Sequence, residues 1–112
     1  MFDDRVSGAL ERALDGVALR QRVTSQNIAN AMTPGYRAQR VEFESSLSAA
    51  LAAGRPREAS FEVVDGGGQA REDGNTVELE SEATSLMRSG LQYEALVQAA
   101  NYRHAILRAA IR

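Results

Sequence analysis

The residue types that could support catalysis are few in this chain and lie apart from one another. His104 is the single histidine, so no Ser/His/Asp arrangement or histidine-based metal motif can be assembled around a second base. A lone histidine on an apolar helix face is more often a packed residue than a catalytic one. The chain holds no cysteine, which excludes disulfides and thiolate metal sites. The residues therefore predict a protein without enzymatic activity.

Acidic and glycine-rich clusters have simpler interpretations than ligand binding. Glu78, Glu80 and Glu82 crowd the start of an expected helix, where carboxylates complement the helix dipole. Asp73 lies near glycines, but the spacing of the acidic residues around it does not make an EF-hand loop. The glycine run at 66–68 lacks the lysine and hydroxyl residue of a phosphate-binding loop. We expect no metal and no cofactor.

The composition indicates helices that pack on other helices and bury little core of their own. The chain has 112 residues, enough for one domain, with 44% hydrophobic but only 5% aromatic residues. The net charge of −2 comes with no basic patch, which argues against nucleic acid as a partner. No apolar run is long enough for a transmembrane helix, so we expect no direct membrane insertion.

Two long segments carry apolar residues at alternating steps of three and four, the period of helices that pair as a coiled coil. We expect a mainly α fold with an N-terminal helix within 1–32, a middle segment at 33–75 and a C-terminal helix within 76–112, as one structural unit. Asn75 is expected to cap the second helix. The residues expected at the helix interface are Leu10, Leu14, Val17, Leu86, Gly90, Tyr93, Val97 and Leu107.

The middle segment is expected to be short, irregular and partly β. Phe43 and Leu47 fit a short amphipathic helix that ends near Gly54, and residues 60–64 alternate like a strand. Residues 66–74 predict a flexible loop or a small hairpin. With so little core expected there, apolar residues off the interface should face neighbouring subunits. These are Val23, Leu91, Leu96, Ala99 and Ile106.

A motif joins the end of the first helix to an abrupt turn. Pro34 should end the helix near Met32 or Thr33, because proline lacks an N–H and restricts the residue before it. Pro34 and Gly35 fit the central positions of a type II turn, in which glycine takes a positive φ. The whole motif comprises Asn27, Ile28, Ala29, Asn30, Thr33, Pro34, Gly35 and Tyr36.

This pattern resembles the N-terminal signature of the bacterial flagellar rod and hook family of axial proteins. Residues 73–80, followed by Gly90 to Tyr93, resemble the proximal-rod members of that family. The resemblance implies a structural subunit of the basal-body rod that forms homo- and hetero-oligomers needed for motility. It implies other rod proteins, the rod-base adaptor, the type III export gate and the surrounding membrane-ring protein as partners. It also implies a place in the periplasmic rod after export without a cleaved signal peptide.

Two questions stay open at the level of the sequence. Asn27 either bonds to backbone near its own helix end or bridges to a neighbouring subunit, whereas Asn30 fits the local role better. The acidic start of the chain has no apolar signal region after it, which by itself indicates the cytoplasm. The alternative function is therefore a cytoplasmic helical-hairpin adaptor or chaperone.

Overall fold

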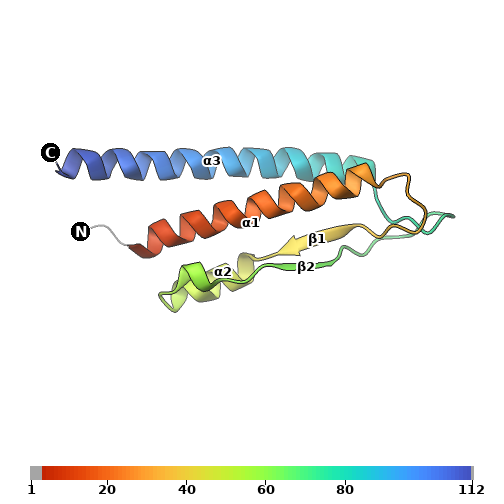
Figure 1. Ribbon diagram of the computed structural model, residues 1–112, viewed down its shortest axis with the longest axis horizontal. Helices are drawn as coiled ribbons and strands as arrows, with labels where there is room; N and C mark the ends of the chain where they lie inside the picture. The colour runs from red at the N-terminus through yellow and green to blue at the C-terminus, as the bar shows by residue number, and fades with distance from the viewer. Residues whose placement is uncertain (1–3, 112) are drawn as a thin grey trace.

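The structure is a computed structural model that describes residues 4–111, and it arranges them in three layers (Figure 1). Helix α1 (Asp4–Ala29) lies in the centre, α3 (Leu79–Ile111) packs along one side of it, and the middle segment covers the other side. The helices run in opposite directions, and the molecule measures 62 × 25 × 14 Å. The predicted fold, two long terminal helices packed on each other with a short β-containing middle, is confirmed.

The middle segment is a folded unit that returns along α1. It contains β1 (Gln39–Glu42), α2 (Glu44–Ala52), a short 3-10 helix η1 (Pro56–Glu58) and β2 (Glu62–Asp65). The two strands pair antiparallel, with Val41 opposite Val63. The expected short helix and the expected second strand are both present, and Gly54 follows α2 with a φ of +79°. Strand β1 was not expected from the sequence.

The principal core lies between α1 and this middle segment. It is formed by Val17, Val23, Val41 and Phe43. The ring of Phe43 meets the ring of Phe61 edge to face, with centroids 5.7 Å apart, a favoured aromatic geometry. Burial of these side chains holds the middle segment on the helix, because removal of apolar surface from water is the main favourable term in folding.

Glycine in α1 makes this approach possible. A Cβ atom placed on Gly16 would lie 2.7 Å from ring carbons of Phe43, so only glycine leaves room for the ring. One face of α1 also carries Arg12 and Arg20, whose guanidinium groups lie over Phe61 and Phe43 at 3.9 and 4.8 Å from the ring centroids. Gly8 also has a packing role, since a Cβ there would lie 3.1 Å from Cγ of Pro56 in the η1 segment.

Two residues expected to face neighbouring subunits belong to this core. Val23 is buried in it, and Leu96 of α3 packs against it. The expectation for both was wrong because it assumed a loosely packed middle segment, whereas β1 and α2 fold back onto α1.

Fewer residues are buried in helix α3 than in α1. Ser89 is its only buried residue within the described part of the chain. The helix begins at Leu79, two residues later than expected, and the Glu82 N–H bonds to the Glu78 carbonyl at 2.9 Å. Among the described residues, no helix combines the length and apolarity that a membrane crossing requires.

Candidate assembly site

The Pro34–Gly35 turn has the geometry expected from the sequence. The Tyr36 N–H bonds to the Thr33 carbonyl at 3.2 Å, and Gly35 has a φ of +76°. Both features match a type II turn. The regular part of α1 ends at Ala29, three residues before the expected end, and a series of tight turns connects it to Thr33. The motif therefore occupies the end of the molecule where α1 gives way to the middle segment (Figure 1).

The first part of the second sequence motif (residues 73–80) lies directly against this turn. The Gly35 N–H bonds to the Asp73 carbonyl at 2.8 Å, and the Thr76 N–H bonds to the Tyr36 carbonyl at 3.0 Å. A Cβ on Gly74 would lie 3.3 Å from the Cα of Gly35, so the backbones meet with little space between them. Two motifs that are about 40 residues apart in the chain thus form one structural element.

A small apolar cluster lies beneath the two motifs. It contains Ala31, Ala38 and Val77, all buried, and the half-buried ring of Tyr36 packs against it. The Ala38 N–H bonds to the Thr76 hydroxyl at 2.8 Å, so a buried polar backbone group has a partner there.

Asn27 has a partner that neither sequence interpretation named. Its side chain is fully buried, its Nδ2 donates to the Gln39 carbonyl at 2.8 Å, and its Oδ1 accepts from the Gln39 N–H at 3.0 Å. The same amide donates to Oε1 of Glu82 on α3 at 3.0 Å. Asn27 therefore joins α1, the start of β1 and α3 within one chain, and its side chain is not presented to a neighbour.

Asn30 has the local role that the sequence favoured. Its Nδ2 donates to the Gln26 carbonyl at 2.8 Å, and its Oδ1 accepts from the Thr33 hydroxyl at 3.1 Å. Of the other motif residues, Ile28 is half-buried and Ala29 is exposed.

Asn75 does not cap α3, so that expectation was wrong. The residue lies four positions before the first residue of the helix. Its side chain points instead to the end of α1, where Nδ2 lies within hydrogen-bond distance of the carbonyls of Asn30, Ala31 and Thr33. Asn75 therefore binds backbone carbonyls of the turn after α1 and does not cap a helix.

The residues expected at the helix interface are only partly brought together. Leu86 and Val97 of α3 are half-buried, and Tyr93 is 38% exposed. Val17 is buried, but in the core shared with the middle segment. Gly90 faces α1 with space to spare, since a Cβ there would lie 3.7 Å from Nε2 of Gln21, an ordinary contact.

The helices leave a crevice between the start of α1 and the end of α3. Leu10 and Leu14 line it from α1, and Leu107 and the exposed His104 line it from α3. Ser7 and Glu11 lie in the same crevice, but no hydrogen bond between either of them and His104 is found in the described structure. The Glu11 carboxylate is instead paired with Arg57 at 3.0 Å.

A strip of exposed apolar side chains runs along α3. Met87 is 71% exposed, Leu91 69% and Tyr102 61%, and Ile106 follows at 40%. Successive members are four, eleven and four residues apart, which is close to one, three and one turns of an α-helix, so they lie on one side of α3. Exposed apolar surface of this kind typically marks a contact with another protein. The sequence had placed Leu91 and Ile106 on such a face.

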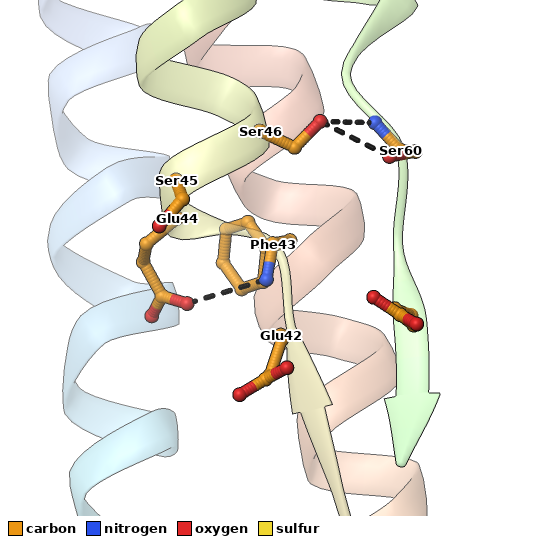
Figure 2. A pocket seen from close by; sticks show the side chains of 7 residues that line it. Glu42, Phe43, Glu44, Ser45, Ser46 and Ser60 are labelled. Carbon is orange, nitrogen blue, oxygen red and sulfur yellow. Dashed lines mark hydrogen bonds between the residues drawn. The ribbon is translucent and has the colours of Figure 1, made fainter.

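A hollow lies beside β1 and α2 (Figure 2). Its walls include Glu42, Glu44, Ser46 and Ser60. Arg20 donates two hydrogen bonds to the Glu44 carboxylate at 2.7 and 2.8 Å, which hold the pKa of Glu44 below its usual value. Ser46 is bonded to Ser60, and within residues 4–111 no cluster of histidine, cysteine and carboxylate side chains could hold a metal ion.

Comparison with known proteins agrees with the two motifs. No family model matches the chain. The chain is 31% identical to the flagellar basal body rod protein FlgB of Bacillus subtilis over 105 residues, which covers 82% of this chain and 81% of the relative. It is 31% identical to FlgB of Escherichia coli over 123 residues, covering 86% and 87%. Identity to FlgB of Salmonella typhimurium is 34% over 118 residues, covering 81% and 83%.

Proposed function

Because the chain belongs to the family of the flagellar basal body rod protein FlgB, we propose that it is a structural subunit of the rod that assembles through its terminal helices. The similarity to rod proteins over most of the chain carries this proposal. The alternative of a cytoplasmic adaptor or chaperone is not favoured, because the relatives are rod proteins. No catalytic role is proposed for His104 or any other residue.

The arrangement of the three layers supports α3 as the main assembly surface. The middle segment already covers one side of α1, and α3 covers another. The face of α3 that carries Met87, Leu91 and Tyr102 has no partner within residues 4–111. A soluble single chain rarely exposes such a strip, so a neighbouring subunit is the natural cover for it.

The expected partners are other rod subunits, the adaptor at the rod base, the export gate and the surrounding membrane-ring protein. We propose a location in the periplasmic part of the basal body, in the proximal rod, reached by type III export without a cleaved signal. These assignments rest on the family resemblance, and the exposed strip supports only the general property of assembly.

A substitution in the strip tests the proposal. Leu91→Glu places a charge on the exposed apolar face and should leave the folded chain intact, because Leu91 is 69% exposed. Asn101→Glu adds the same charge on an exposed position one residue before Tyr102, off the strip, and serves as the control. We expect Leu91→Glu protein to be secreted but missing from purified basal bodies, with loss of swimming. Asn101→Glu should assemble.

Two outcomes would contradict the proposal. Normal assembly and swimming with Leu91→Glu would show that the strip is not an assembly surface. If the protein without any substitution were found only in the cytoplasm, with no copy in basal bodies, the adaptor alternative would become the favoured function.

A further inference from the structure

Side-chain hydrogen bonds tie the turn that follows α1 to the segment before α3. Helix α1 ends at Ala29, and in the turn after it the carbonyls of Asn30, Ala31 and Thr33 lie 2.9, 3.1 and 2.8 Å from Nδ2 of Asn75. The carbonyls of Asn30 and Thr33 also accept backbone N–H groups within the turn. The Arg71 guanidinium donates from Nη2 to the Ala31 carbonyl as well. Both donors come from the segment that precedes α3.

The same two side chains are fixed to the approach of α3. The Oδ1 of Asn75 accepts a hydrogen bond from the Val77 N–H at 2.7 Å, and Asn75 is fully buried. Arg71 donates from Nη1 to the Val77 carbonyl at 2.8 Å. Val77 lies two residues before the start of α3. Arg71 and Asn75 therefore each contact both the turn after α1 and Val77, just before α3.

Helix α3 packs along α1, but few of its side chains are buried by this contact. Ser89 is the only buried residue of that helix in the described range, and Asn27 of α1 donates a hydrogen bond to Glu82 of α3. In so long a helix, the geometry of the first residues strongly affects where the far end lies. An error of a few degrees at Leu79 would displace Ile111 by several ångströms over a helix of roughly 50 Å.

We propose that Arg71 and Asn75 are positioning residues, and that they form a clasp that sets the direction in which α3 leaves the end of α1. The clasp consists of these two side chains and the backbone of residues 30–33 and 77. In this proposal Asn75 of the second sequence motif and the nearby Arg71 act on the turn after α1 within one chain, and they make no contact with a neighbouring subunit. The clasp is a property of the single chain, so its test does not depend on the proposed rod function.

The absence of cysteine allows the direction of α3 to be measured directly. Spin labels on Asp15→Cys of α1 and Ala105→Cys of α3, both exposed sites, report the distance between the helices by pulsed electron resonance. The parent should give a single narrow distance distribution. Asn75→Asp replaces the amide donor with a carboxylate that faces three carbonyl oxygens. Arg71→Lys keeps the positive charge but cannot donate to the Ala31 and Val77 carbonyls at the same time, as the guanidinium does. Both should broaden or shift the distribution.

Matched controls separate the clasp from general charge effects. Asn101→Asp makes the same chemical change on an exposed part of α3, and Arg55→Lys changes an exposed arginine paired with Glu58. Both should leave the distribution unchanged. Amide exchange offers a second readout: the N–H groups of Gly35 and Thr76 should exchange roughly tenfold faster or more in the clasp variants. Far-ultraviolet circular dichroism should show that helix content is kept.

The possible results decide the proposal in either direction. An unchanged distance distribution in both clasp variants would overturn it, and so would a broad distribution in the parent. If Asn75→Asp loses its helix content, Asn75→Ser, which keeps a single small donor, and Arg71→Lys become the deciding variants. Broadening in these folded variants alone, with the controls unchanged, would establish the clasp even if the rod function were disproved.

Discussion

Gly16 gives the sharpest test of how the middle segment is held on α1. A Cβ on Gly16 would lie 2.7 Å from two ring carbons of Phe43, whereas ordinary contacts begin near 3.4 Å. Gly16→Ala therefore requires the ring to move by about 0.7 Å within a packed core. Overpacking of this kind costs roughly 1–3 kcal/mol. Alanine regains up to about 1 kcal/mol of helix propensity over glycine, so with the full gain the net loss should be up to about 2 kcal/mol.

Gly90 is the matched control for the same substitution. It also lies inside a long helix, but a Cβ there would meet only the end of the Gln21 side chain at 3.7 Å. Gly90→Ala should therefore keep the propensity gain and stabilise the protein by up to about 1 kcal/mol. The two variants make one chemical change in two helices, and the opposite signs come from packing alone.

Thermal unfolding followed by circular dichroism measures both effects. In a domain of this size about 1 kcal/mol corresponds to a shift of roughly 4–8 °C in Tm, so the two variants should move in opposite directions by several degrees. Combining Gly16→Ala with Phe43→Leu should recover part of the loss, because the smaller side chain leaves room for the methyl group. Equal stabilisation by Gly16→Ala and Gly90→Ala would refute the close-contact argument for Phe43.

Three further outcomes are expected. Replacing Pro34 and Gly35 with alanines removes the helix block and the residue at positive φ, so the protein should be secreted but should not assemble, as measured by motility with secretion checked separately. The pKa of Glu44 is lowered by its hydrogen bonds to Arg20, so this pair stabilises the fold above the unfolded pKa of Glu44 and the contribution disappears as pH falls through the lower folded value. Urea midpoints of the parent and Glu44→Gln should converge in acid, and a constant gap would contradict this. His104→Ala should swim normally, because the imidazole lies exposed at a crevice and, within residues 4–111, has no hydrogen bond to Ser7 or Glu11; a secreted but non-motile strain would show that the imidazole is needed.

The turn and the long helices could be predicted from the sequence because they depend mainly on residues close together in the chain. The Pro34–Gly35 turn follows from the conformational limits of two residues, and the structure has its hydrogen bond and its positive φ. The terminal helices follow from apolar spacing over many residues, which averages out individual exceptions. These features need no knowledge of where the rest of the chain lies.

Features that depend on tertiary contacts could not be predicted in this way. Strand β1 has one buried residue, Val41, among three exposed ones, so its four residues carry almost no pattern of alternation. Val23 was assigned to a neighbouring subunit because nothing in the sequence places β1 on α1. The error at Asn75 has the same origin, since nothing in the sequence shows that this asparagine binds the turn after α1 and not the start of the following helix.

The remote position of the clasp residues also bears on the order in which the chain can fold. A ribosome delivers residues from the N-terminus, so α1 emerges well before Asn75, which lies 45 positions after Asn30. Until then the turn after α1 lacks its hydrogen bonds from Asn75, and before Phe43 and Phe61 emerge α1 has no hydrophobic cover from the middle segment. An isolated helix of this kind is only marginally stable in water. The nascent chain should therefore stay largely unfolded until Asn75 has emerged, and folding should then be completed in one late step.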